Sequence, residues 1–189
     1  MSADHLSSIW AQPDKKPVFT LLDWEVVLGQ AMQARLNARL ARHMAEHGWL
    51  SETPLEVRQY LEGGLRLSDR QQHEVQWEVD CIWRALRELG GPIVLLKGAA
   101  YLIAGLPSGR GRLFSDIDIM VHHEQLSDVE GALFRHGWIG EERDPYNDRY
   151  YREWMHEIPP MKHVRRNTVI DVHHTITPPT SRFKVDASK

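Results

Sequence analysis

The sequence predicts an α+β protein in which a small mixed β-sheet is flanked by helices and preceded by a helical appendage. In the first half of the chain, apolar residues recur about four apart, which is the spacing of an amphipathic helix. After Pro92, short apolar runs and runs of alternating polar and apolar residues take over, with helical segments between them. The chain has 189 residues, of which 42% are hydrophobic and 26% charged, and this is enough for one packed domain with an appendage.

The first half is expected to consist of a flexible arm and three helices. Residues 1–17, which include two prolines and two lysines near their end, are expected to form the arm. Thr53 and Ser68 each open a helix with a capping partner three residues further on, and glycines stop the helices. We therefore expect residues 18–91 to form a helical appendage. Its helices are predicted from about Leu21 to His47, from Thr53 to Gly63-Gly64 and from Ser68 to Leu89.

The second half is expected to contain the sheet, within a core of residues 92–178 that a tail of residues 179–189 follows. The last two strands are predicted to pair as a hairpin across Arg165-Arg166-Asn167. The predicted strands are 93–96, 114–121, a segment that begins at Trp138, 161–164 and 168–173, and the predicted helices are 98–105 and 124–136.

Charge and cysteine content limit the classes of function. The formal net charge is -3, which gives no overall basic field, so strong nonspecific binding of nucleic acid is not indicated. Cys81 is the single cysteine, which excludes an internal disulfide and fits a reducing compartment. No apolar run approaches the length of a membrane span, and the N-terminus lacks a signal-peptide pattern. We therefore expect a cytoplasmic protein that does not enter a membrane.

Asp116 and Asp118 are the strongest indication of a functional site. They alternate with aliphatic residues in the predicted strand 114–121, and residues two apart on a strand point to the same side. Two carboxylates held this close repel each other and raise each other's pKa, and a bound divalent cation such as Mg²⁺ commonly offsets that repulsion. The pair therefore predicts a metal site.

A third carboxylate lies on the last predicted strand. In the segment 169–173, Asp171 and His173 share one face, and a two-metal site needs more anionic ligands than one Asp pair provides. His173 is expected either to orient a carboxylate or to contact substrate. The pairs His122-His123 and His173-His174 do not favour a zinc site, because adjacent strand residues point to opposite faces.

Three elements in this order resemble the DNA-polymerase-beta-like nucleotidyltransferase superfamily, and most closely its branch of uncharacterised nucleotidyltransferases with a Lys-Gly opening. The elements are Lys97-Gly98 between a strand and a helix, Arg112 followed by Ser115-Asp116-Ile117-Asp118-Ile119, and Ile170-Asp171-Val172-His173. The resemblance covers about residues 75–175 and implies a polymerase-beta-like nucleotidyltransferase core. Members of this branch continue into a helical region after the third acid, so residues 179–189 are expected to lead toward such a region.

The resemblance also implies roles for the residues that carry it. Asp116 and Asp118 would ligate two Mg²⁺ or Mn²⁺ ions, and Asp171 would ligate the catalytic one of the two. Lys97, Gly98, Arg112 and Ser115 would bind the nucleotide, although Ser115 also suits a turn. Arg110 and His173 are accessory candidates, and Arg110 and Arg112 equally fit a solvated loop.

The function expected from this resemblance is transfer of a nucleoside monophosphate (NMP) from an NTP to an unidentified hydroxyl acceptor, with release of pyrophosphate. Two alternatives stay open: a non-catalytic nucleotide-binding or regulatory module, and a metal-dependent glycosyltransferase. The expected partners are an NTP and the unknown acceptor, and the helical half is a candidate surface for a protein partner or a second copy. Neither a basic groove nor an RNA-binding signature indicates a nucleic-acid acceptor.

Overall fold

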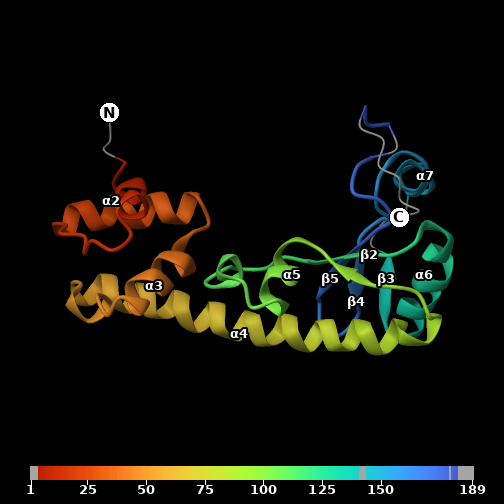
Figure 1. Ribbon diagram of the computed structural model, residues 1–189, viewed down its shortest axis with the longest axis horizontal. Coiled ribbons are helices and arrows are strands. Elements are labelled where there is room, and N and C mark those ends of the chain that lie inside the picture. Colours follow the sequence, from red (N-terminus) through yellow and green to blue (C-terminus); the bar gives the residue numbers. More distant parts are fainter. Residues whose placement is uncertain (1–3, 141–143, 179, 183–189) are drawn as a thin grey trace. The chain divides into compact units, whose positions relative to one another are not determined.

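The computed structural model describes residues 4–140, 144–178 and 180–182. These residues form the α+β architecture that the sequence predicts, with a five-stranded mixed sheet and a long helical region before it (Figure 1). Contacts between residues divide the chain into two compact units. The helical unit comprises Met1–His73 and Pro107–Leu113, and the sheet unit comprises Glu74–Leu106 and Phe114–Lys189.

The helical unit consists of helices packed around their own apolar core. Helix α2 starts with a capping box, in which Thr20 Oγ1 accepts from the Asp23 N–H and the Asp23 carboxylate accepts from the Thr20 N–H. Trp24 and Val27 of the same helix are fully buried in the core. The elements of this unit are α1 (His5–Ala11), α2 (Leu21–Gln33), α3 (Asn37–Glu46), the short 3-10 helices η1 (Leu50–Glu52) and η3 (Pro107–Gly109), and the first part of α4 (Leu55–Leu86).

Two features of this unit differ from the expectation. Part of the arm expected over residues 1–17 is helix α1, because Leu6 and Ile9 are buried in the helical core. The single helix expected over 21–47 is two helices, α2 and α3. The chain turns between them at Arg35, which has a positive φ of 58° and thereby ends the helical hydrogen-bond pattern.

Helix α4 is continuous where the sequence predicted two helices. Gly63-Gly64 and Ser68 lie inside it and interrupt nothing. A glycine inside a helix costs only about 1 kcal/mol, and burial of the apolar face of α4 on both sides of the glycine pair exceeds that cost. The division into the two compact units falls inside this helix, between His73 and Glu74. The buried residues of α4 include Val57, Leu61, Ser68, Val75, Ile82 and Leu86.

The sheet has the strand order β1-β2-β5-β4-β3. Strands β2 and β5 are parallel neighbours, and the other three pairs are antiparallel. The antiparallel pairing of β4 with β5 confirms the predicted hairpin. The strands are β1 (Val94–Leu95), β2 (Ile117–Met120), β3 (Trp138–Gly140), β4 (Met161–His163) and β5 (Val169–His173).

The apolar core of the sheet unit lies against one face of this sheet. Ile117 and Ile119 of β2 and Ile170 and Val172 of β5 join residues from α4 and α6 in one buried cluster. Because side chains alternate along a strand, Asp118, Asp171 and His173 project from the opposite face. The helices of this unit are the end of α4, η2 (Arg87–Leu89), α5 (Lys97–Ile103), η4 (His123–Gln125), α6 (Leu126–Arg135) and α7 (Pro145–Trp154), of which the sequence did not predict α7.

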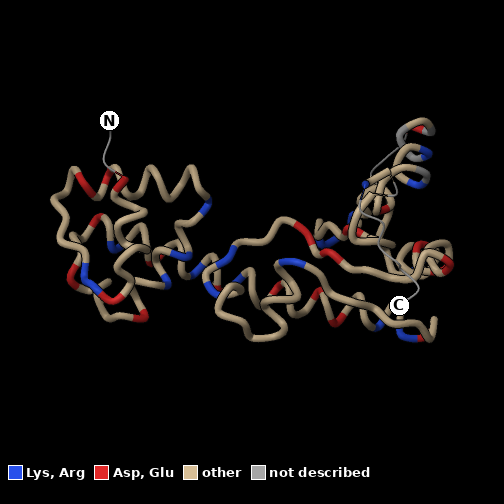
Figure 2. Tube along the Cα trace, turned by 45° about the horizontal axis from the view of Figure 1, so that its top comes forward, with Lys and Arg blue, Asp and Glu red and all other residues tan. Residues whose placement is uncertain are grey.

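Acidic and basic residues are interspersed along the described trace of both units, in keeping with the small net charge (Figure 2). Within the described residues, none of the helices combines the length and the apolar character needed to cross a membrane.

Candidate functional site

Asp118 and Asp171 are direct neighbours across the parallel strands β2 and β5. They are partners in the strand register, so their side chains lie side by side on the face opposite the apolar core. Asp118 is buried and Asp171 is half-buried. The parallel pairing therefore brings together two carboxylates that are distant in the sequence.

Asp116 completes a group of three carboxylates. It immediately precedes β2, is half-buried, and accepts a hydrogen bond from the Ser115 hydroxyl through Oδ1 at 3.0 Å. Its negative charge contributes to the raised pKa values of both Asp171 and Lys97. Ser115 is exposed and contacts the first carboxylate of the group.

Lys97 supplies a positive charge beside Asp118. It is the first residue of α5, directly after β1, and its φ of 46° is strained for a residue with a side chain. Its Nζ lies 2.5 Å from Asp118 Oδ1, and the Leu96 N–H donates to the Asp118 carbonyl at 2.9 Å. The hydrogen bond to Asp118 raises the pKa of Lys97 above its usual range, which keeps the ammonium charged. The β1–α5 junction thus directs a cation at the buried carboxylate.

His173 contacts two carboxylates through its two ring nitrogens. Its Nε2 lies 3.0 Å from Asp118 Oδ1, and its Nδ1 lies 3.3 Å from Glu157 Oε2. Burial opposes ionisation of Asp118, but the hydrogen bonds from His173 and Lys97 outweigh it and hold the pKa of Asp118 below its ordinary value. Asp118 is therefore a charged carboxylate at neutral pH.

Asp171 has the opposite electrostatics. Burial, followed by the negative charges of Glu157, Asp116 and Asp118, raises its pKa to about 6. Its Oδ1 atom is buried and accepts no hydrogen bond from the described residues. An unpaired carboxylate oxygen among several negative charges suits a hard divalent cation, which prefers oxygen ligands. The residues present therefore fit Mg²⁺ or Mn²⁺.

Like its neighbour His156, Glu157 is a site residue that the sequence analysis missed. Its only local signal is a charged residue beside Ile158 and before Pro159-Pro160, which does not distinguish it from a surface loop. Ligand atoms of His156, Glu157 and His173 lie within 4.8 Å of one another, so this group also has the composition of a cation site. Glu157 reaches the site because it forms a β-bridge with His173.

The other predicted nucleotide-binding residues are divided between the two units. Gly98 is buried in α5, beside Lys97. Arg110 and Arg112 are exposed and belong to the segment of residues 107–113 that is part of the helical unit. Arg110 forms an ion pair with Glu46 at 3.8 Å. The roles of the two arginines as phosphate partners stay predictions.

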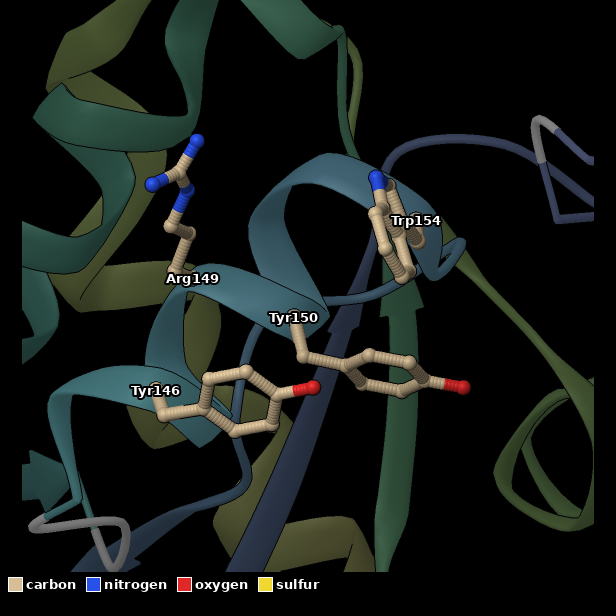
Figure 3. A pocket seen from close by; sticks show the side chains of 4 residues that line it. All are labelled: Tyr146, Arg149, Tyr150 and Trp154. Carbon is tan, nitrogen blue, oxygen red and sulfur yellow. The ribbon is translucent and has the colours of Figure 1, made fainter.

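Helix α7 forms a separate hollow lined by aromatic residues and an arginine (Figure 3). Tyr146, Tyr150 and Trp154 are exposed, and the rings of Tyr150 and Trp154 meet edge to face with centroids 5.7 Å apart. Arg149 is the fourth lining residue, and the lining contains none of the carboxylates described above. Exposed rings of this kind provide a stacking surface.

A family model described as "Uncharacterised nucleotidyltransferase" matches residues 20–189. The match includes most of the helical unit and the whole of the sheet unit. No curated protein and no solved structure matches the chain at a significant level.

Proposed function

Because the chain belongs to the family of uncharacterised nucleotidyltransferases, we propose that it transfers an NMP from an NTP to a hydroxyl acceptor and releases pyrophosphate. The observation that carries the proposal is the group of three carboxylates at the β2–β5 pair, with Asp118 and Asp171 in register. Asp116 joins this group through its electrostatic effect on Asp171. Carboxylates are suitable ligands for the divalent metals that assist phosphoryl transfer, and this supports the proposal.

Asp116, Asp118 and Asp171 would hold Mg²⁺ or Mn²⁺. The unpaired Oδ1 of Asp171 and the charge of Asp118 support this assignment. When bound, the metal supplies positive charge that makes the acceptor hydroxyl more acidic and neutralises the triphosphate. Family members of this kind act on nucleotides, so an NTP is the proposed substrate and the acceptor is a hydroxyl of unspecified chemistry.

Residues of the chain would accept the proton of the acceptor hydroxyl and bind the triphosphate. In the transfer, the acceptor oxygen forms a bond to the α-phosphorus, the bond from that phosphorus to the bridging oxygen breaks, and pyrophosphate leaves with that oxygen. Asp171 is the proposed acceptor of the hydroxyl proton, because a base is most effective when its pKa lies near the working pH. Lys97 would contact triphosphate oxygens, since its exposed ammonium is adjacent to the carboxylates.

Gly98, Arg112 and Ser115 remain proposed nucleotide contacts, and Arg110 a proposed accessory contact. Gly98 has no side chain to obstruct a phosphate beside Lys97. The exposed guanidinium of Arg112 suits bidentate binding of phosphate oxygens. The three acids together disfavour a non-catalytic nucleotide-binding module, and the family match disfavours a glycosyltransferase.

The test measures transfer of the labelled NMP from α-labelled ATP, GTP, CTP or UTP to acceptor molecules in fractions of a cell extract, with Mg²⁺ or Mn²⁺ present. Asp116→Asn and Asp118→Asn are expected to abolish transfer, because each removes charge from a shared metal ligand. Asp171→Asn is expected to abolish transfer but to retain more nucleotide binding. Lys97→Ala is expected mainly to raise the KM for the nucleotide, because a phosphate contact present before and during the reaction is uniform binding.

Asp80→Asn is the matched control, because Asp80 is an exposed carboxylate on α4 in the same unit. It is expected to behave as the wild-type protein. Full transfer by Asp118→Asn would refute the metal-dependent mechanism, and equal loss of nucleotide binding in all four site variants would refute the division of roles.

A further inference from the structure

We propose that His173 is a positioning residue that holds the Asp118 carboxylate in place for the metal and nucleotide. Glu157 in turn holds His173. The inference rests on the proposed function, since it assigns Asp118 to the metal. It adds two residues, His173 and Glu157, that act on the site through Asp118 rather than by contact with the reacting atoms.

The first argument is the hydrogen bond between His173 and Asp118. An ionised carboxylate only accepts hydrogen bonds, so the Nε2 that lies 3.0 Å from Asp118 Oδ1 is the donor. His173 is the register partner of Met120, and its ring therefore reaches diagonally across the β2–β5 pair to Asp118. Both side chains are buried, so water does not compete effectively for this hydrogen bond.

The second argument is that the position of the His173 ring is itself held from several directions. Glu157 forms a β-bridge with His173, the Ile158 N–H donates to the Val172 carbonyl at 3.0 Å, and the Glu157 carboxylate lies 3.3 Å from Nδ1. The His156 ring stacks on the His173 ring with centroids 5.1 Å apart and an angle of 29° between the planes. Residues 156–158, which follow α7, thus pair with the end of β5 and hold the His173 ring in position.

The third argument is the contrast between the two donors to Asp118. Lys97 and His173 both contact Oδ1, so neither of them occupies Oδ2. The Lys97 side chain is 58% exposed and can turn toward a phosphate, whereas His173 is 2% exposed and is held by its neighbours. When Lys97 turns away, His173 keeps Oδ1 in place and leaves Oδ2 available for another ligand.

The test compares His173→Leu, which removes the donor, with His173→Gln, whose amide nitrogen can reach the position of Nε2. Removal of a group that orients a metal ligand weakens metal affinity or activity by about 10–100-fold. We expect His173→Leu to weaken Mn²⁺ binding by calorimetry within that range and to lower kcat more than it raises KM. His173→Gln is expected to recover most of both, and Glu157→Gln to give a smaller loss than His173→Leu.

His163→Leu is the matched control. His163 is also a buried sheet histidine, but its ring contacts backbone groups of His136, Arg165 and Arg166 and no carboxylate of the site. It is expected to lower the melting temperature without a change in Mn²⁺ affinity. Unchanged Mn²⁺ affinity in folded His173→Leu, or equal losses in His173→Leu and His173→Gln, would overturn the proposal. If His173→Leu does not fold, unchanged Mn²⁺ affinity and kcat in Glu157→Gln would overturn it.

Two further measurements distinguish failure of this inference from failure of the proposed transfer function, and a positioning role of His173 from a role as a metal ligand. A double-mutant cycle of His173→Leu with Asp118→Asn on the free energy of unfolding, without metal, tests the contact independently of any transfer reaction; additive effects would overturn the proposal. If wild type shows this coupling but neither binds Mn²⁺ nor transfers NMP, the proposed function fails while the contact stands.

Stabilisation of wild type by Zn²⁺ alone, lost in His156→Ala, would make the group of His156, Glu157 and His173 a metal site and overturn the positioning role.

Discussion

Asp118 and Asp171 are neighbours across β2 and β5, yet their surroundings move their pKa values in opposite directions. Asp118 is buried but accepts from His173 and Lys97, and these hydrogen bonds favour its charged form. Asp171 is also shielded from solvent, but its neighbours are other carboxylates and its Oδ1 has no donor among the described residues. The difference follows from which donors reach each oxygen.

The raised pKa of Asp171 predicts a stability that falls with rising pH in the absence of metal. Between pH 3.8 and about 6 the folded state binds more protons at this group than the unfolded state does. The contribution of Asp171 to the free energy of unfolding therefore decreases through this window. Without metal, Asp171→Asn is expected to be more stable than wild type at about pH 7.5, by about 1–3 kcal/mol, and to lose this advantage near pH 4.

Urea denaturation of both proteins in a chelating buffer, from about pH 4 to 8, measures this difference. The comparison at each pH cancels titration of groups that both proteins share. A difference that stays constant with pH would show that Asp171 does not titrate with a raised pKa. Added Mg²⁺ should make wild type the more stable of the two proteins at high pH, because only the wild-type Asp171 carboxylate can act as a charged ligand to the bound ion.

At the scale of elements, α4 shows how burial overrides local breakers. Gly63 and Gly64 each weaken an isolated helix, but the buried face of α4 continues past both. A Cβ added to Gly63 would have no heavy atom within 4 Å, apart from its chain neighbours and the backbone of its own helix. The conformation there is helical and suits any residue with good helix propensity.

Gly63→Ala is therefore expected to raise the free energy of unfolding by about 0.5–1 kcal/mol. Alanine restricts the unfolded chain and meets no obstacle in the folded one. Thermal or urea denaturation would measure the gain. Gly48→Ala is the contrasting variant, because Gly48 has a φ of 72° and alanine there should cost about 1 kcal/mol. Destabilisation by Gly63→Ala would mean that α4 is not continuous at this point.

An ion pair between Arg166 and the buried Glu78 links the β4–β5 hairpin to α4. Arg166 donates to Glu78 through Nε at 2.7 Å and through Nη2 at 2.9 Å, and its guanidinium lies 4.8 Å from the centre of the Trp138 ring. Glu78 is 2% exposed, and the ion pair with Arg166 offsets the cost of removing its carboxylate from water. The pair joins the turn of the hairpin to the helix beneath the sheet.

Arg166→Met is expected to destabilise the protein by about 3–5 kcal/mol, because it leaves a buried charge without a partner. The double variant Glu78→Leu, Arg166→Met should lose much less, since no uncompensated charge remains. Urea denaturation of both variants and of wild type gives the comparison. Equal losses in the single and double variants would mean that packing, rather than the ion pair, holds the hairpin.

At the scale of the whole molecule, the two units have separate apolar cores. Asp116, Asp118, Asp171, Lys97 and His173 all belong to the sheet unit. Helix α4 is the element shared by both, with its first part in the helical unit and its end in the core of the sheet unit. Ligand binding at the carboxylates should therefore act first on the sheet unit.

Hydrogen exchange is expected to show this localisation. A mixture of ATP, GTP, CTP and UTP with Mn²⁺ should slow amide exchange in residues 117–121 and 169–173 several-fold, because binding stabilises the native state of that region. Residues 24–44 of the helical unit should change little. Asp118→Asn should remove the effect. Equal slowing in both units would show that ligand binding stabilises the whole chain as one cooperative body.

Local patterns in the sequence were enough to locate the strands that carry Asp118, Asp171 and His173, the position of Asp116 directly before β2, the hairpin, and the Lys97-Gly98 junction. The reason is physical: alternation along a strand and the four-residue spacing of a helix are short-range properties that each segment carries within itself. The same patterns failed at α4 and at α1, where burial against other elements decides whether a helix forms or continues.

The tertiary structure alone decided which of these residues meet. His173 and Asp118 are 55 positions apart, and only the parallel pairing of β2 with β5 brings them within hydrogen-bond distance. Glu157 enters the site only because its segment bridges to β5, and nothing in its local sequence marks it. The pKa values depend on the same assembly, since burial and neighbouring charges exist only once the strands have packed. Long-range pairing is set by the fit of whole apolar faces, which no single segment of the sequence contains.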